Sequence, residues 1–166
     1  MKIICEASEK YKPFQDDVCG MLLGMLQELA ELEKDIFERD KAYNAQKLKN
    51  GLEPYQMYPE WHDLMKEYRM RYKEIVEPRC TEKLLKRRYA NSFGSPQKYG
   101  YLNEECTVCF KMRAFDRATV ETHYKKHQQG SEYKHKFSLV LVDGKWLLDA
   151  VYYGFENDKT WHVDNI

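Results

Sequence analysis

Four side chains in the second half of the chain are of types that perform acid–base chemistry: Glu121, His123, His135 and Asp149. A carboxylate or an imidazole can transfer a proton when it lies in a pocket beside a substrate. One face of a predicted strand carries Glu121, His123 and Lys125 at every second position, so these three are expected to form a solvated row. Asp149 is expected on the outer side of a hairpin, and His135 as a hydrogen-bonded histidine at the edge of the core. The pattern therefore favours a protein that is not an enzyme.

Metal and cofactor chemistry is not predicted either. Cys106 and Cys109 form a CxxC pair, but residues three apart on a strand point to opposite faces, and no second ligand pair has suitable spacing. His123 and His127 would likewise be well separated on a strand. No phosphate-binding glycine loop is present. The five cysteines form no regular framework, which indicates reduced thiols and a cytoplasmic protein.

A basic segment, Arg87-Arg88-Tyr89 with Lys83 and Lys86 before it, raises the question of nucleic-acid binding. One interpretation is contact with phosphate or RNA. The other is a helix end, where cations interact favourably with the last carbonyl groups. The chain has 27 basic and 27 acidic residues, so it lacks the basic excess typical of a dedicated nucleic-acid binder. The second interpretation is preferred, and no direct binding to nucleic acid is predicted.

The elements that must position these residues begin with a hairpin over 133–153. Asp143-Gly144 is a two-residue loop of the kind that forms a type I′ turn. Period-two alternation predicts earlier strands over 106–113 and 118–125, and 161–166 is expected to add an edge. The hairpin register pairs Leu141 with Trp146, Leu139 with Leu148, Phe137 with Ala150, Val140 with Leu147, Ser138 with Asp149 and Lys136 with Val151.

Helical periodicity dominates the first half of the chain. It predicts a long amphipathic helix over 14–49 that ends at Asn50-Gly51, and a second over 60–76 that Pro78 ends. Thr81 is expected to cap a third helix over 82–92. The first dozen residues are not assigned. The acidic side of the long helix is interpreted as solvated, or else as a docking surface for a basic partner, and comprises Glu28, Glu31, Glu33, Asp35, Glu38 and Asp40.

Length and composition indicate one α+β domain over 1–166, with a helical part at about 14–93 and a sheet part at about 98–166. Hydrophobic residues make up 43% of the chain, enough to build a core. No apolar run is long enough to cross a membrane, and the N-terminus becomes polar too early for a signal peptide.

Several strings in the second half resemble NTF2-fold immunity proteins of bacterial polymorphic toxin systems, which belong to the nuclear transport factor 2-like superfamily. The resemblance begins near Arg79, and the long first helix and the loop between Pro54 and Pro59 lie outside it. It implies an NTF2-like cone, in which N-terminal helices pack on a curved antiparallel sheet. The strings are RRYANSFG (87–94), KYGYL (98–102), VETHY (120–124), KHKF (134–137), KWLLD (145–149), YYGF (152–155) and Trp161.

The resemblance implies a binding function without catalysis or cofactor. Immunity proteins of this kind bind the cognate toxin and block it, and many such toxins are nucleases with a basic surface. The alternative is an enzyme or small-ligand-binding protein that uses the cavity of the cone, and a homodimer formed through sheet faces is a further option.

Aromatic rings and carboxylates gather near the end of the chain, a composition suited to docking on a basic protein. In the other interpretation the rings fill the open mouth of the cone while the carboxylates lie in water. The predicted partner-binding residues are Tyr153, Phe155, Glu156, Asp158, Trp161 and Asp164.

Overall fold

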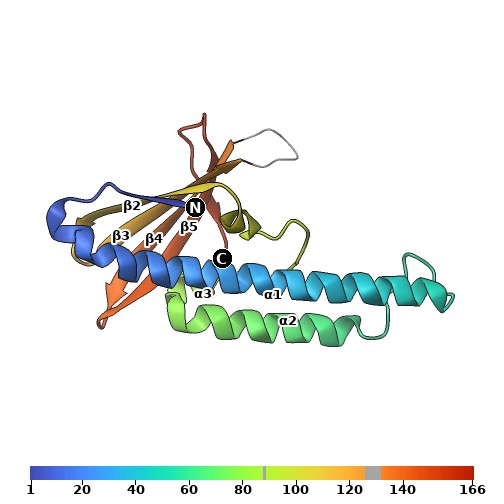
Figure 1. Ribbon diagram of the computed structural model, residues 1–166. Coiled ribbons are helices and arrows are strands. Elements are labelled where there is room, and N and C mark those ends of the chain that lie inside the picture. Colours follow the sequence, from blue (N-terminus) through green and yellow to red (C-terminus); the bar gives the residue numbers. More distant parts are fainter. Residues whose placement is uncertain (88, 126–131) are drawn as a thin grey trace.

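The protein folds as one sheet with a helical layer on one face, which confirms the α+β prediction (Figure 1). The computed structural model describes residues 1–87, 89–125 and 132–166. The helices are α1 (Gln15–Lys49), α2 (Trp61–Val76) and α3 (Glu82–Leu85), with 3₁₀ segments η1 (Glu9–Phe14), η2 (Glu77–Arg79) and η3 (Gly100–Asn103). The strands are β1 (Lys2–Cys5), β2 (Cys106–Ala114), β3 (Arg117–Lys125), β4 (Glu132–Val142), β5 (Lys145–Phe155) and β6 (His162–Asp164).

The sheet has six strands among the described residues, in the order β1-β2-β3-β4-β5-β6. β1 runs parallel to β2, and every other neighbouring pair is antiparallel. β1 lies in the N-terminal stretch that the sequence left unassigned. β6 confirms the edge strand that was expected within 161–166.

The long first helix is confirmed, and its apolar stripe faces the core. The six apolar residues that form this stripe are all buried: Val18, Leu22, Met25, Leu29, Leu32 and Ile36. The helix ends at the expected place, because Gly51 adopts a φ of +80° that glycine tolerates best. α2 is also confirmed and lies along α1 (Figure 1).

The third predicted helix is much shorter than expected, because α3 ends at Leu85. Thr81 does cap it, since its side-chain oxygen accepts a hydrogen bond from Leu84 N. Beyond the helix, Tyr89 stacks on Tyr72 of α2, and Ala90 has a φ of +51°, which is incompatible with a helix. Packing of this segment against α2 therefore overrides its local helix propensity.

The predicted hairpin register is correct near the turn and wrong beyond it. Asp143 and Gly144 both have positive φ, and the pairs nearest the turn are as expected. A β-bulge follows between Ser138 and Leu139, where β5 has one more residue than β4. The corrected pairs are Phe137 with Val151, Ser138 with Ala150 and Lys136 with Tyr152.

The bulge lies where another part of the chain joins β5. Cys80 forms an isolated bridge to Leu148, and Thr81 N donates to Leu148 O at 2.9 Å. Asp149, the residue next to this bridge, turns its carboxylate toward Thr81 and Lys83 instead of pairing with Ser138. Thr81, which precedes α3, thus bonds both Leu148 and Asp149 of β5, at the point where the bulge interrupts the hydrogen bonds between β4 and β5.

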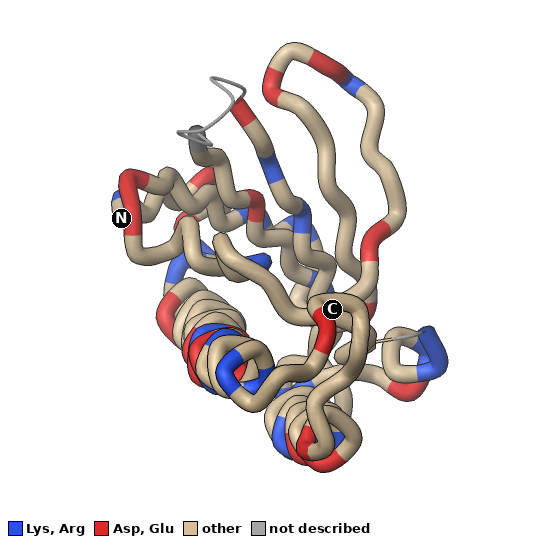
Figure 2. Tube along the Cα trace, turned by 90° about the vertical axis from the view of Figure 1, so that its right-hand side faces the viewer, with Lys and Arg blue, Asp and Glu red and all other residues tan. Residues whose placement is uncertain are grey.

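Both long helices, α1 and α2, carry acidic and basic residues (Figure 2). Part of the acidic side of α1 is paired instead of solvated, because Arg79 bonds Glu28 and Arg71 bonds Asp35. Glu33 is an exception to the expected solvation, since it is buried and accepts a hydrogen bond from Lys98 N at 2.8 Å. The expectation of a solvated acidic side is therefore wrong for Glu33.

Replacement of Glu33 by glutamine is expected to stabilise the protein near neutral pH by on the order of 1 kcal/mol. Burial raises the pKa of Glu33, and the hydrogen bond from Lys98 N only partly opposes this. A raised folded pKa contributes stability below the ordinary pKa of the group, and this contribution is lost as pH rises through the folded value. The gain in Glu33→Gln should therefore grow with pH. Urea unfolding between about pH 4 and pH 8 measures it.

The exposed neighbour Glu31 provides the control. Glu31→Gln removes the same charge from the same helix and should change stability by less than about 0.5 kcal/mol at every pH. Equal pH dependence of the two variants would contradict the assignment of the titration to Glu33.

Candidate functional site

The six predicted partner-binding residues lie at one end of the sheet but on two faces of it. Tyr153 pairs with His135 and Phe155 pairs with Tyr133, so both face the side of the sheet that holds the core. Asp164 of β6 pairs with Val151 and faces the same side. The other three residues belong to the connection from β5 to β6. The structure therefore brings these residues to one end of the sheet without forming one continuous surface from them.

Tyr153 and Phe155 form part of an aromatic rim on the core side, which we define as Tyr133, Tyr153, Phe155 and His162. The ring centroids are 5.1 Å apart for Tyr133 and Phe155, and 5.2 Å apart for Tyr153 and His162. Tyr153 is 37% exposed and Phe155 is 43% exposed. Because the rim rests on paired strands, its rings present apolar area at a small cost in conformational entropy.

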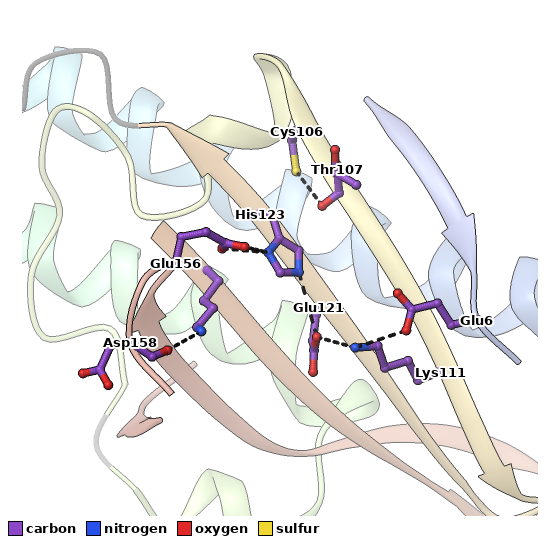
Figure 3. Close-up of polar contacts among 9 residues, drawn as sticks. Glu6, Cys106, Thr107, Lys111, Glu121, His123, Glu156 and Asp158 are labelled. Carbon is purple, nitrogen blue, oxygen red and sulfur yellow. Dashed lines mark hydrogen bonds and ion pairs between the residues drawn. The ribbon is translucent and has the colours of Figure 1, made fainter. Parts of the chain in front are cut away.

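The connection over 156–161 folds onto the opposite, outer face of the sheet (Figure 3). Lys134 Nζ donates to the backbone oxygen of Asp158 at 2.6 Å. The amino groups of Lys134 and Lys136 lie 4.8 Å and 4.3 Å from the centroid of the Trp161 ring. These cation–π contacts hold Trp161, which is only half-buried, against β4.

Gly154 allows the connection to lie this close to the sheet. A Cβ atom at this position would be 2.9 Å from the backbone oxygen of Thr160 and 3.2 Å from Cε of Lys134. Asp158 fixes the same turn, since its carboxylate accepts a hydrogen bond from Thr160 N at 2.9 Å. Hydrogen bonds from Thr160 lower the pKa of Asp158, which keeps this exposed carboxylate charged.

An ion-pair row crosses the outer face from β2 to the β5–β6 connection (Figure 3). Lys111 Nζ lies 3.3 Å from Glu6 and 2.7 Å from Glu121. His123 Nδ1 lies 2.8 Å from a carboxylate oxygen of Glu156. Burial lowers the pKa of Lys111, but the hydrogen bonds and charges of Glu121 and Glu6 outweigh it, so the pKa is raised.

The row departs from the sequence expectation in two respects. Glu121 and His123 are half-buried and paired, not simply solvated, because Lys111 and Glu156 reach them. Two members of the row, Lys111 and Glu6, were not among the predicted residues. The outward positions of the strand alternation could have indicated Lys111, but the position of Glu6 depends on β1, which was not predicted. The side chain of Lys125 lies outside the described part of the structure.

A buried polar cluster lies deeper on the core side and contains His135. His135 Nδ1 lies 3.2 Å from the hydroxyl of Tyr101, which in turn is 2.9 Å from Thr122 Oγ1. Burial raises the pKa of Tyr101, so its hydroxyl stays protonated. Asp164 approaches His135 Nε2 at 4.0 Å and Lys98 Nζ at 3.1 Å. His135 is therefore a hydrogen-bonded histidine within the core, as the sequence analysis expected.

Asp149 has a structural role at the bulge. Its carboxylate accepts hydrogen bonds from Thr81 Oγ1 at 3.0 Å and from Lys83 Nζ at 2.6 Å. Burial alone would raise the pKa of Asp149, but these two hydrogen bonds outweigh it and the pKa lies below its ordinary value. An ionised carboxylate held by two donors joins β5 to α3 and is poorly suited to act as a general base.

The basic segment is also used within the fold. Lys83 bonds Asp149, and Arg87 donates to the backbone oxygen of Asp164. Tyr89 lies beyond the end of α3 and stacks on Tyr72 of α2. Arg88 and His127 lie outside the described residues.

The cysteines are all free thiols. Burial raises the pKa of Cys106 to about 11, so this thiol is protonated and unreactive at neutral pH. In the described ranges, no three His, Cys, Asp or Glu side chains are grouped as metal ligands would be. None of the helices described has the length and apolar character that a membrane span requires.

Comparison with protein-family models, with curated proteins and with solved structures found no significant match to this chain.

Proposed function

We propose that this chain is an immunity protein of the NTF2-like superfamily that binds and neutralises a cognate bacterial polymorphic toxin of the nuclease type. The observation that carries the proposal is the exposed aromatic rim, with Phe155 and Tyr153 displayed on paired strands. Exposed rings on a rigid support are typical anchors of protein–protein interfaces. The resemblance of the strings over 87–155 supports the same class of protein.

The partner in this proposal is a basic toxin domain. Glu156 and Asp158 belong to the connection that follows the rim residue Phe155, at the same end of the sheet, and both are exposed. Exposed carboxylates near an interface favour a positively charged partner and speed its association, and these two lie on the face of the sheet opposite the rim. A nuclease toxin carries positive charge where it binds nucleic acid, and the cytoplasm is where the two proteins would meet.

The proposed activity requires neither catalysis nor a cofactor. Three of the candidate acid–base residues contribute to the fold: Asp149 joins β5 to α3, His123 pairs with Glu156, and His135 bonds Tyr101. Replacement of His135 or Asp149 is expected to affect neutralisation of the toxin only through stability. The neutral net charge argues against direct binding to nucleic acid.

A second candidate function is an enzyme or small-ligand-binding protein that uses the interior of the sheet. The buried polar cluster favours it, because Tyr99 places a hydroxyl there that has no hydrogen-bond partner among the described residues. A polar ligand in the interior would supply that partner. A small molecule retained in native mass spectrometry, with no toxin bound, would favour this candidate.

Affinity capture from native cells tests the first proposal. The tagged chain should retain a protein in equal amount, and the toxin domain of that protein should stop growth when expressed alone but not with this chain. Phe155→Ala should weaken binding of that domain at least about 30-fold, as expected for an aromatic anchor. Met70→Ala, at an exposed apolar side chain on α2, is the control and should bind normally.

Two results would overturn the proposal. One is a captured protein that is harmless when expressed alone. The other is a toxin that remains fully active beside this chain.

A further inference from the structure

A pocket lies where the connection joins the end of α1 to the start of α2, away from the sheet. The last turns of α1, the first turn of α2 and the connection between them extend beyond the strands (Figure 1). The cavity measures about 280 Å³. This volume is near the lower end of the ~300–1,000 Å³ that small-molecule sites occupy, so it suits a single side chain. We name it the tip pocket, and its wall includes Asp40, Asn44, Lys47, Tyr55, Tyr58 and Trp61.

Lys47 holds the wall of the tip pocket in place. Its Nζ atom donates to the backbone oxygens of Pro54 at 2.9 Å and Gln56 at 2.6 Å, and the residue is only 7% exposed. The ammonium group is thereby committed to the connection between the helices. The pocket is thus a built feature of the hairpin, with its wall tied to α1.

Asp40 contributes a carboxylate whose charge is not neutralised. Its Oδ1 atom accepts a hydrogen bond from the Tyr58 hydroxyl at 2.7 Å. Burial and this bond raise the pKa of Tyr58, so the donor remains protonated. Asp40 forms no ion pair with any residue that the structure describes, whereas Asp35, one turn earlier, pairs with Arg71. The second oxygen of Asp40 is therefore available to a ligand.

Aromatic rings line the same pocket as this carboxylate. Tyr58 stacks on Tyr43 with centroids 5.1 Å apart and meets Trp61 edge-on at 5.9 Å. Tyr55 is 84% exposed at the rim of the pocket. A carboxylate beside ring faces is the arrangement that binds a guanidinium group, which stacks on rings and donates two parallel hydrogen bonds.

The charge of the connection favours a cation as well. Residues 53–63 contain three carboxylates, Glu53, Glu60 and Asp63, and no lysine or arginine. The Lys47 charge is covered by carbonyl oxygens and is almost wholly buried. The last turns of α1 also carry the exposed Lys41 and Lys49, so attraction of a basic side chain depends on the carboxylates of the connection and on Asp40 in the pocket wall.

We propose that the tip pocket receives an arginine side chain of a protein partner, with the guanidinium on Asp40 and against the rings of Trp61 and Tyr55, which are more accessible than the buried Tyr58. The inference rests on the proposed function for the identity of the partner alone, which is then the basic toxin domain. The chemistry of the pocket does not depend on that identity.

Titration with N-acetylarginine amide, followed by NMR of the labelled full chain, tests the chemistry of the pocket. Peaks of Trp61 and its neighbours in the pocket should shift, and Asp40→Asn should abolish the shifts while keeping an acceptor for Tyr58. N-acetylcitrulline amide, the neutral analogue, should produce none. Absence of shifts with the arginine probe, or equal shifts with citrulline, would overturn the proposal.

Binding of the captured toxin domain to variants of this chain tests whether an arginine of the toxin occupies the tip pocket. Asp40→Asn should weaken its binding about tenfold, as loss of one charge-assisted contact predicts. Glu38→Gln removes the same charge from an exposed position two residues away and outside the pocket wall, so its binding should stay within about twofold of the parent.

The two proposals fail in different ways. Unchanged toxin binding in Asp40→Asn overturns the pocket inference and leaves the immunity function in place. Specific binding of N-acetylarginine amide without any captured toxin supports the guanidinium site and counts against the immunity function.

Discussion

Replacement of Tyr101 by phenylalanine is expected to lower the free energy of unfolding by about 1–3 kcal/mol. The Tyr101 hydroxyl lies between Thr122 Oγ1 and His135 Nδ1, and all three side chains are buried. Phenylalanine keeps the ring, including its close stacking on Tyr124, but leaves two buried polar groups without this partner. Urea unfolding of the variant and the parent measures the difference.

Tyr99 provides a matched control two residues away. It is fully buried in the same aromatic region, but its hydroxyl has no hydrogen-bond partner among the described residues. Tyr99→Phe removes a buried hydroxyl without breaking a bond, so stability should be unchanged or higher. Equal destabilisation by the two substitutions would show that ring packing, not hydrogen bonding, accounts for the effect at Tyr101.

Replacement of Gly154 by alanine is expected to lower the free energy of unfolding by about 1–3 kcal/mol, the usual cost of overpacking. The new Cβ atom would be 2.9 Å from the backbone oxygen of Thr160. The connection over 156–161 must then move away from the outer face, which weakens the contacts of Lys134 with Asp158 O and with Trp161. Thermal unfolding measures the loss, and tryptophan fluorescence reports the exposure of Trp161.

Gly20 in α1 is the control for this substitution. It is exposed, and a Cβ atom there would meet nothing within 4 Å. Gly20→Ala should therefore stabilise the protein by about 0.5–1 kcal/mol, because alanine loses less backbone entropy in a helix. If both substitutions shift stability in the same direction, the close approach at Gly154 does not determine its effect.

The two long helices, α1 and α2, and the turn of the hairpin could be predicted because local signals agree with the final packing. The stripe on α1 repeats over many turns, so one face is specified several times along the sequence. Asp143-Gly144 adopts the two positive φ angles that a type I′ turn demands. Such signals depend on a few neighbouring residues and not on the rest of the chain.

The elements that could not be predicted depend on distant partners. α3 ends early because Tyr89 stacks on Tyr72, a contact that local propensity does not reveal. β1 exists because it pairs with β2, about a hundred residues away in the sequence. The bulge in β5 arises where Cys80 and Thr81 join that strand. Each of these features is determined by tertiary contact, which overrides local preference.

The candidate site shows the same division. Composition indicated which residues near the end of the chain to consider, but only the strand register shows that Phe155 and Trp161 lie on different faces. Asp40 was one of several acidic residues on a helix, and its place in a pocket depends on the turn between α1 and α2. Sequence pattern thus identified types of residue, and the fold determines which of them can act together.

The length of α1 has a consequence for any partner that contacts both the aromatic rim and the tip pocket. A helix of 35 residues is about 52 Å long, whereas an 11-residue strand spans about 37 Å, so α1 extends well past the sheet. The two contact points are thereby separated on one folded body. When either contact breaks, the other keeps the partner at high local concentration and favours rebinding. Lengthening or shortening α1 by whole turns would change which partners can span both points.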